Sequence, residues 1–289
     1  MARKMKITAG IPLFNSLTTI RRVIDEVMRQ SHPPEEIIVV DDGSSDGSGA
    51  KAKTPYVRLI THKRNRGLAE ARNTIVENAD NEIVVFFDAD AIPGRDCVKH
   101  LVKHFKDSEV AAVGGRGIEG GLDNMAGRWR ARITPQDHGD IPIQDDWMLM
   151  GLCCAFRKTV IEQVGGFDSN FQAAGEDVDI CLRIRQAGYR LVYEPSATVQ
   201  HLPGGGMLSV TQQAMKHAKF ASYALSKNGE SEVEYIRDTY THLTASALRD
   251  LKKGRYGDSL FSIVNMVART AGIIAGKAKA KSEMMKKSH

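Results

Sequence analysis

The sequence of 289 residues has little that would mark a thiolate metal site, a nucleic-acid surface or a secreted protein. Its four cysteines lack metal-ligand spacing, and the adjacent Cys153 and Cys154 lie in an apolar context that favours reduced core thiols over a disulfide. No arginine-rich or aromatic-interleaved basic stripe occurs, so we expect no nucleic-acid partner. The opening residues, MARKMKITAGIPLFN, hold no apolar region long enough for a secretory signal. We therefore expect a cytosolic protein.

One further absence concerns the class of enzyme. No Gly-x-Gly-x-x-Gly follows the first expected strand, which argues against the dinucleotide site of an oxidoreductase. What is present is ordinary for a globular protein, with 42% hydrophobic residues, 26% charged residues and a net charge of +5. The length suits one large domain, or a catalytic domain with a smaller appendage.

Short apolar runs alternate with helical patterns over the first 115 residues. This alternation predicts βαβ units and a mostly parallel sheet covered by helices on both faces. In such sheets, ligands bind beyond the carboxyl ends of the strands. Strands are expected at residues 5–11, 36–42, 57–61, 82–88 and 110–115, and helices at 17–30, 68–78 and 95–105.

The second half of the sequence is less regular. Residues 116–147 are predicted to form loops, and helices are expected at 157–164 and at 176–187, the latter closed by Gly188. Two short strands, RLVYE and ATVQH, follow, and the chain after LPGGG is predicted to be helical to its end. We predict a catalytic domain over 1–206, with a nucleotide-binding part over 1–115 and an acceptor part over 116–206. A helical extension would occupy 207–289.

Two aspartates, Asp88 and Asp90, follow the apolar run EIVVFF directly. A buried carboxylate without a partner is unfavourable, so a cation is expected beside them. At the end of this strand, the period of two places both side chains on the same side of the pleat. Two such carboxylates suit Mg²⁺ or Mn²⁺ that also binds a diphosphate. The alternative is that both cap the helix expected near Arg95.

Two other polar clusters follow strands. Asp41 and Asp42 in VVDDGSSDGS either cap a polar turn or face a base or ribose. A calcium loop is a weak alternative there, because Lys53 occupies the position that needs a bidentate Glu. Arg72 and Asn73 fall in the first turns of the helix after Gly67, where they either bind a phosphate or form a solvated helix face.

A third cluster lies near residue 176. Glu176 and Asp177 open a helix, and its dipole favours acids there, so capping alone would explain them. His201 lies just past a strand and before a glycine run, and is either structural or a ligand.

Six segments taken together resemble the family 2 glycosyltransferases, which are inverting and nucleotide-sugar dependent and have the Rossmann-like GT-A fold. They occur in the family's order and cover about residues 5–206. The segments are IPLFN, EIIVVDDGSSDGS, NRGLAEARN, VVFFDADAIP, GGFD and GEDVDICLRIRQAGYRLVYEP…VQH.

The resemblance implies roles for particular residues. Asp90 would be the main metal ligand, with Asp88 near the ribose and metal and His201 as an additional ligand. Asp177 would be the catalytic base, and Glu176 would support the acceptor side. Asp41 or Asp42 would contact the nucleotide base. The implied nucleotide-sugar contacts are Pro12, Asn15, Asp41, Asp42, Asn65, Gly67, Arg72, Asn73, Asp88 and Ala89.

The resemblance also implies a reaction: a metal-dependent, hexosyltransferase-like transfer from a nucleotide-diphosphate sugar, UDP-linked by default, to a glycan or lipid-linked glycan, as in polysaccharide biosynthesis. A non-catalytic nucleotide-sugar or carbohydrate-binding protein is the main alternative. A sugar-phosphate nucleotidyltransferase is less favoured, because no Gly-rich loop with Arg or Lys follows the first strand. One segment departs from the family, since Gly151-Leu152-Cys153-Cys154 replaces the usual Gly-Gly-Asn-like residues near the acceptor.

The C-terminal stretch 259–287 combines apolar residues with lysines. Its apolar part of about 17 residues is interrupted by Asn265 and Arg269, which argues against a membrane span. Two alternatives remain open. The stretch either packs on the catalytic domain or a twin subunit in a homodimer, or lies in a membrane interface with its lysines at anionic headgroups. The second would make the protein peripheral on the cytoplasmic face through residues 255–289.

Overall fold

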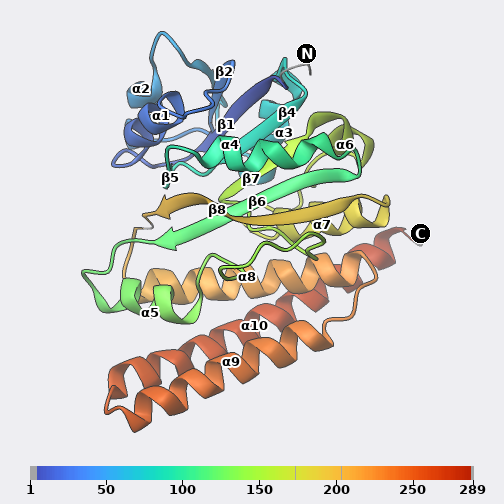
Figure 1. Ribbon diagram of the computed structural model, residues 1–289. Coiled ribbons are helices and arrows are strands. Elements are labelled where there is room, and N and C mark those ends of the chain that lie inside the picture. The colour runs from blue at the N-terminus through green and yellow to red at the C-terminus, as the bar shows by residue number, and fades with distance from the viewer. Residues whose placement is uncertain (1–4, 173, 203, 288–289) are drawn as a thin grey trace. The chain divides into compact units, whose positions relative to one another are not determined.

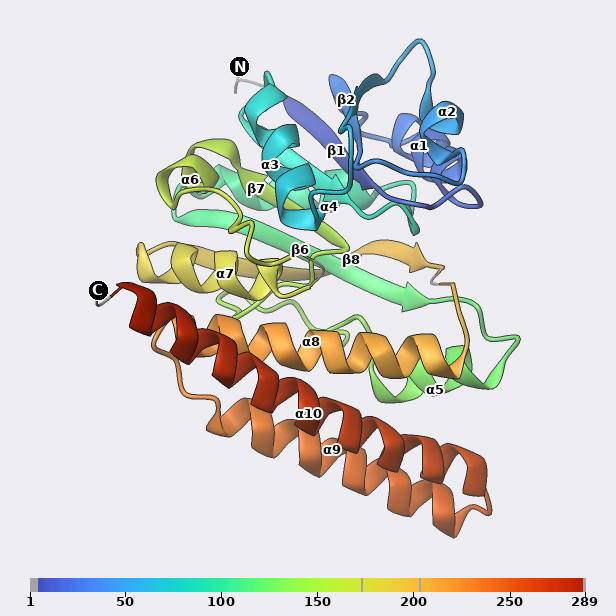
Figure 2. The same ribbon diagram turned by 180° about the vertical axis from the view of Figure 1, so that it is seen from behind.

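The computed structural model describes residues 5–172, 174–202 and 204–287, and Figures 1 and 2 show it from two opposite sides. Contacts divide the chain into two compact units. The first holds residues 1–118 and 136–202, and the second holds 119–135 and 203–289. The helical unit thus includes a segment from the middle of the chain. The domain boundary expected between residues 206 and 207 stays a prediction.

The first unit contains an eight-stranded sheet in the order β3-β2-β1-β4-β7-β6-β8-β5. Strands β3, β2, β1 and β4 pair in parallel, while β4–β7, β6–β7 and β5–β8 pair antiparallel. The predicted α/β class is confirmed, and the parallel arrangement covers one half of the sheet. The strands are β1 Ile7–Leu13, β2 Glu36–Asp41, β3 Arg58–Thr61, β4 Ile83–Phe87, β5 Ala91–Pro93, β6 Val110–Glu119, β7 Cys153–Arg157 and β8 Arg190–His201.

Helices cover both faces of this sheet, as the alternation predicted. Successive strand residues point to opposite faces, so in β4 Val85 packs with one apolar cluster and Phe86 with the other. Helices α1 and α4 contribute to the first cluster, and α3, α6 and α7 to the second. Their bounds are α1 Ile20–Met28, α3 Leu68–Asn78, α4 Cys97–Val102, α6 Lys158–Gln163 and α7 Glu176–Gln186.

Some elements differ from the predicted ones. The short helix α2, Ser48–Ala52, and the strands β5 and β7 were not predicted, and β8 is one strand where two were expected. Residues 103–106 form a 3-10 turn instead of the last turn of α4. Strand β7 was missed because CCAFR, five residues long, is too short for a period to show. The free, buried state of all four cysteines confirms the expected reduced thiols.

The second unit consists mainly of helices joined by short connections. It contains α5 Met125–Ile133, α8 Met207–Lys227, α9 Val233–Lys252 and α10 Tyr256–Lys287. The prediction of a loop across residues 116–147 is wrong over α5, where Asn124 accepts a hydrogen bond from the amide of Gly127 and starts the helix. Trp129 of this helix is fully buried and donates to Ser262 of α10 over 2.9 Å. Helix α5 is thus stabilised by residues more than a hundred positions away, which local periodicity does not reveal.

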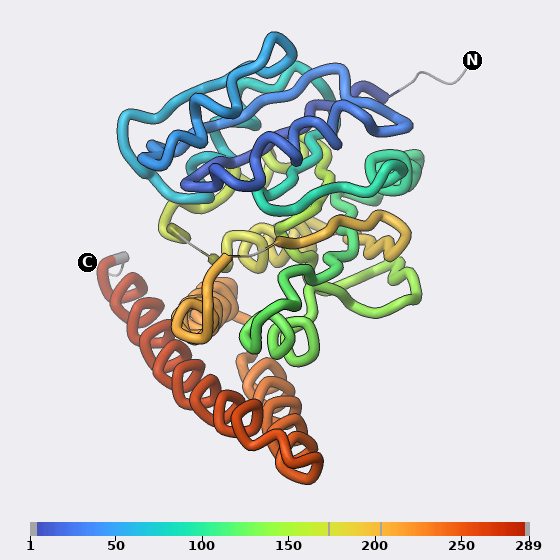
Figure 3. Tube along the Cα trace, turned by 90° about the vertical axis from the view of Figure 1, so that its left-hand side faces the viewer, coloured from blue at the N-terminus to red at the C-terminus, as the bar shows by residue number. Residues whose placement is uncertain are grey.

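Helix α10 packs against both α8 and α9, and Figure 3 shows it as a long rod at the C-terminal end. Its contact with α8 is close, because a Cβ added at Gly272 would lie 2.3 Å from the carbonyl oxygen of Met215, and one at Gly276 would lie 2.2 Å from that of Lys219. The helix continues without a break through Asn265 and Arg269. By length and composition alone it is apolar enough to cross a membrane, although 39% of the apolar window is buried in the protein.

Candidate functional site

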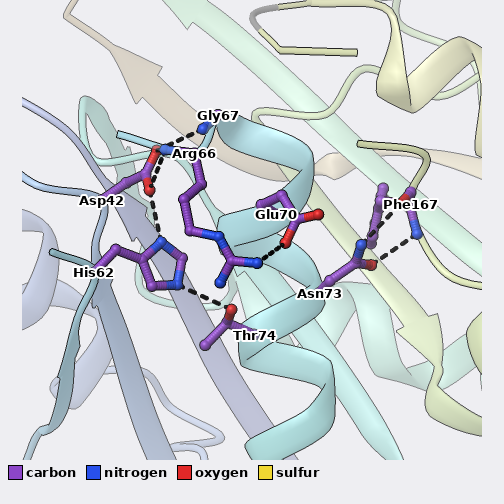
Figure 4. A network of polar contacts seen from close by, with 8 residues as sticks. All are labelled: Asp42, His62, Arg66, Gly67, Glu70, Asn73, Thr74 and Phe167. Atoms are coloured by element: carbon purple, nitrogen blue, oxygen red, sulfur yellow. Dashed lines mark hydrogen bonds and ion pairs between the residues drawn. The ribbon is translucent and has the colours of Figure 1, made fainter. Parts of the chain in front are cut away.

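The carboxylate of Asp42 joins the end of β2 to the start of α3 (Figure 4). It accepts hydrogen bonds from the amides of Arg66, at 2.9 Å, and Gly67, at 2.8 Å. Nδ1 of His62 lies 2.6 Å from its Oδ1, and Nε2 of the same ring lies 3.0 Å from the hydroxyl of Thr74. Asp42 is 3% exposed, so its oxygens are already satisfied inside the protein. The residue fixes the loop that precedes α3.

The neighbouring loops at the ends of β1 and β2 are also joined to each other. Asp41 accepts from the amide of Ser44 over 2.9 Å, which matches the polar-turn alternative. Asn15 accepts from the amide of Ser45 over 2.9 Å, and has a positive φ of 48°, a conformation that asparagine tolerates better than most residues. Pro12 is buried within β1, whereas Asn65 is exposed. These loops form one hydrogen-bonded rim at the carboxyl ends of the parallel strands.

Asn73 holds the loop that precedes α7. Its amide nitrogen donates to the carbonyl of Phe167 over 2.7 Å, and its amide oxygen accepts from the Phe167 amide over 2.8 Å (Figure 4). A Cβ at Gly166 would lie 2.9 Å from that oxygen, so the glycine is needed for the close approach. Asn73 was predicted to contact the nucleotide sugar, and the structure instead places both of its amide atoms on the main chain of Phe167.

The backbone at Asp88-Ala89-Asp90 corrects the strand argument made for the two carboxylates. Strand β4 ends at Phe87, and residues 88–90 form a turn closed by a hydrogen bond from the amide of Ala91 to the carbonyl of Asp88. The period of two therefore does not apply, and the two side chains have different partners. Asp88 pairs with Arg72 at 3.0 Å, and Asp90 lies 3.8 Å from Nε2 of His201.

Asp90 and His201 are held together by the pairing of β5 with β8, in which Ala91 lies opposite His201. A carboxylate oxygen and an imidazole nitrogen at this separation fit the ligand preferences of Mn²⁺ or a similar divalent cation. Among the described residues, no group of three or more His, Cys, Asp or Glu side chains is arranged to hold a metal ion. A cation held by Asp90 and His201 would need its remaining ligands from water or from a bound ligand.

Arg72 lies at the centre of the site and is 2% exposed. Its Nη1 donates to Glu176 over 2.7 Å, and its Nη2 donates to Asp88 over 3.0 Å and to the carbonyl of Gly151 over 2.9 Å. The predicted role of Arg72 as a direct phosphate ligand is not what this geometry favours, because its guanidinium already binds two carboxylates and a carbonyl. The predicted helix start after Gly67 is confirmed.

Burial and crowding of charge shift the protonation of this cluster. Burial raises the pKa of Glu176 to about 8, the charge of Asp177 adds to the rise, and Arg72 opposes it. Burial also raises the pKa of Asp88, against the opposing charge of Arg72. Burial alone would lower the pKa of Arg72, but Glu176 and Asp88 outweigh it and raise that pKa. One guanidinium thus pairs with two carboxyl groups, and the pKa of both is raised by burial despite the neighbouring charge.

Asp177 is half-buried in the first turn of α7, where the helix dipole favours a negative charge. Its Oδ2 accepts a hydrogen bond of 3.1 Å from the amide of Gly151. Hydrogen bonds therefore connect Asp88 to Asp177 by way of Arg72 and the main chain of Gly151, and Arg72 also binds Glu176. Asp90 lies two residues after Asp88, and the charges of Asp90 and His201 both act on the Asp88 carboxyl group. The role of Gly151 was not predicted, although the sequence flagged its segment as unusual.

Comparison with known proteins adds a family and a fold. The model of glycosyl transferase family 2 matches residues 8–165. A pre-mycofactocin glycosyltransferase of Mycobacterium tuberculosis is 33% identical over 209 residues, which cover 68% of this chain and 42% of that protein. The O-antigen chain rhamnosyltransferase RfbN of Salmonella typhimurium is 27% identical, over 68% of this chain and 66% of that protein. The chain thus spans less than half the length of its mycobacterial relative.

Two solved structures share the fold. The mannosyltransferase PcManGT from Pyrobaculum calidifontis, in complex with GDP-Man and Mn²⁺, aligns over 96% of this chain and 88% of its own, with a TM-score of 0.64 and 21% identity. GalNAc-T7 with UDP, GalNAc and Mn²⁺ aligns over 78% of this chain and 48% of its own, with a TM-score of 0.57 and 18% identity. The predicted GT-A fold is confirmed by this likeness.

Proposed function

Because the chain belongs to glycosyl transferase family 2, we propose that it moves a sugar from a nucleotide-diphosphate sugar to an acceptor hydroxyl. One observation carries the proposal: Arg72 connects Asp88, beside Asp90 and His201, to the N-terminus of α7, where Asp177 lies. Such a reaction needs one group to serve the departing diphosphate and another to activate the acceptor. The cluster supplies carboxylates for both.

On the departure side, Asp90 and His201 would hold a divalent cation, Mn²⁺ or Mg²⁺, with Asp88 beside it. When bound, such a cation offsets the negative charge that develops on the leaving diphosphate. The rim of Asp41, Asp42 and Asn15 would shape the nucleotide pocket. UDP sugars are the first donors to test, and GDP sugars the second, because solved structures of this fold contain UDP in one case and GDP-Man in the other.

On the attack side, Asp177 would take the proton from the acceptor hydroxyl as its oxygen attacks the anomeric carbon. Attack from the face opposite the leaving group inverts the stereochemistry in one displacement. The amide of Gly151 fixes one carboxylate oxygen of Asp177 in the first turn of α7. Glu176, whose pKa is raised to about 8 by burial, is suited to a neutral supporting role beside it.

The acceptor would be a glycan or a lipid-linked glycan. Curated relatives include an O-antigen chain rhamnosyltransferase and a poly-beta-1,6-N-acetyl-D-glucosamine synthase of Staphylococcus aureus, which is 26% identical. The loop that precedes Gly151 exposes two large apolar side chains, Ile141 at 77% and Trp147 at 48%. An exposed aromatic ring of this kind suits a sugar, which has both an apolar face and hydroxyl groups.

The C-terminal helix α10 would bring this reaction to a membrane surface. Its residues Leu260, Ile263, Val264 and Val267 form an exposed apolar stripe at helical spacing. Residues 255–289 carry seven basic and two acidic side chains, a net charge of +5, so residues 1–254 balance to zero. An apolar stripe in the most basic part of the chain favours a peripheral position on an anionic, cytoplasmic membrane face.

The product of the reaction tests the proposal. Wild-type protein with Mn²⁺ and a panel that includes UDP-N-acetylglucosamine and GDP-mannose should release a nucleoside diphosphate, and Asp177→Asn should release it more slowly by roughly 10²-fold or more. Binding of a nucleotide sugar with no turnover under any acceptor condition would favour the non-catalytic alternative. Formation of a nucleotide sugar and pyrophosphate from a nucleoside triphosphate and a sugar phosphate would favour the nucleotidyltransferase.

A further inference from the structure

The surroundings of Arg72 are more specialised than a buried charge requires. The guanidinium lies over the rings of Phe86 and Phe167, with its central carbon 5.7 Å and 5.6 Å from the two ring centroids. Burying a charge is costly unless it is paired and hydrogen-bonded. A side chain that only filled this space would be apolar, so the charge needs another explanation.

The acceptors of the Arg72 hydrogen bonds come from three separate parts of the chain. Asp88 follows β4, Glu176 opens α7, and Gly151 precedes β7. A planar guanidinium fixes both the distance and the direction of the groups that it binds. The side chain therefore sets the separation between the turn that holds Asp88 and the first turn of α7.

The peptide of Gly151 extends this connection to Asp177. Its carbonyl accepts from Arg72 over 2.9 Å, while its amide donates to Asp177 Oδ2 over 3.1 Å. A Cβ at this position would lie 2.9 Å from both terminal nitrogens of Arg72 and 3.2 Å from Asp177 Oδ2. A side chain at residue 151 would therefore displace the guanidinium and press on the carboxylate.

We propose that Arg72 is a positioning residue that acts through the Gly151 main chain to aim Asp177 at the acceptor while holding Asp88 on the donor side. The inference rests on the proposed function, in which Asp177 is the base. It assigns Arg72 no contact with substrate. A substitution that removes the fork but keeps the positive charge should then impair the attack step, while the retained charge beside Asp88 leaves donor binding nearly intact.

Arg72→Lys tests the inference, because lysine keeps the positive charge but cannot bind three acceptors with a planar fork. We expect the turnover number to fall by about 10-fold to 100-fold, the loss that follows a small displacement of a catalytic group. The KM for the donor, and the Kd of UDP or GDP with Mn²⁺ measured by calorimetry, should stay within about 3-fold of wild type. Gly151→Ala should also lower the turnover number without changing donor binding, because it displaces the same hydrogen bonds. This variant provides the test if Arg72→Lys does not fold.

Arg183→Met is the matched control for lost stability. Arg183 also lies on α7, pairs with the buried Asp179 at 2.6 Å, and donates to the carbonyl of Val164. Its removal should lower the melting temperature without the selective fall in turnover. Turnover of Arg72→Lys within 2-fold of wild type, or a loss no larger than that of Arg183→Met, would overturn the inference. A wild-type protein without turnover would overturn the proposed function, and the inference with it.

Discussion

Oδ2 of Asp90 and Nε2 of His201 lie 3.8 Å apart, although 111 positions separate the two residues in the sequence. The antiparallel pairing of β5 with β8 brings them together, because Ala91 is opposite His201. A carboxylate and an imidazole so placed can share one divalent cation.

Asp90→Ala should abolish both turnover and the Mn²⁺-dependent binding of UDP or GDP, since a carboxylate ligand is lost. His201→Ala should weaken the dependence on Mn²⁺ and leave the melting temperature close to wild type. Calorimetric titration with and without EDTA measures both effects, and Asp80→Ala, an exposed aspartate of the same unit, is the control. Full activity of Asp90→Ala in EDTA would refute the metal role, and an unchanged Mn²⁺ titration would make His201 structural.

Asp177→Asn should bind the donor and metal almost as wild type does, while turnover falls by roughly 10²-fold or more, the usual scale for loss of a general base. The substitution removes the negative charge and retains the shape of the side chain. Steady-state kinetics and nucleotide titration separate the two effects. A collapse of donor binding in this variant would assign Asp177 a structural or metal-binding role instead.

Stability should fall as the pH rises through the pKa of Glu176. Burial raises the pKa of Glu176 in the folded protein to about 8, whereas the pKa of an unperturbed glutamate is 4.5. Between these two values the folded state binds more protons than the unfolded state, so the free energy of unfolding decreases with increasing pH, by at most about 1.4 kcal/mol per pH unit. Glu176→Gln should flatten this dependence in thermal unfolding from pH 5 to 9. Glu162→Gln, at an exposed position, should not. Equal slopes in all three proteins would contradict the prediction.

Asn73→Ala should destabilise the first unit by about 1–3 kcal/mol, because the main chain of Phe167 loses a donor and an acceptor. Turnover should fall as well, since the ring of Phe167 borders the guanidinium of Arg72. Chemical denaturation measures the first effect. Asn170→Ala, an exposed asparagine in the same loop that bonds to Asp168, should change stability by less than about 0.5 kcal/mol. A loss in Asn73→Ala no larger than this would remove the assigned anchoring role.

The full-length protein should float with liposomes that contain phosphatidylglycerol at low salt. The paired substitution Val264→Glu with Val267→Glu should abolish flotation by charging the apolar stripe, whereas Val233→Glu, an equally exposed valine on α9, should not. Point variants are preferable to truncation, because α10 packs closely on α8 at Gly272 and Gly276. Failure of the wild type to float would exclude the membrane surface. Resistance to alkaline extraction would instead show that α10 spans it, and a dimer in light scattering would favour a twin subunit.

Much of the fold and part of the site could be predicted from the sequence. The bounds of α3 match because its apolar spacing follows a glycine at the start, and β2 and β4 match because they are buried on both faces. The turn at Asp88–Asp90 was not predictable, since the residue types there do not show where the backbone changes from extended to turn dihedral angles. Arg72 reads in sequence as an exposed charge on a helix, and its burial depends on Asp88, Glu176 and Gly151, which lie between 16 and 104 residues away.

The reversal of direction between β4 and β7 has a consequence for how such an enzyme diversifies. Phe87 at the end of β4 lies opposite Cys153 at the start of β7. The loop that leads into β7, which arrives at this edge of the sheet, therefore lies beside the turn that follows β4. Within that arriving loop Ile143 and Asp146 are hydrogen-bonded to β8, whereas Ile141 and Trp147 are exposed and can be substituted without moving Asp42 or Asn15. Related enzymes that differ in this loop would then differ in acceptor specificity and share the same nucleotide-sugar donor. Exchange of this short loop between homologues offers a direct route to altered products.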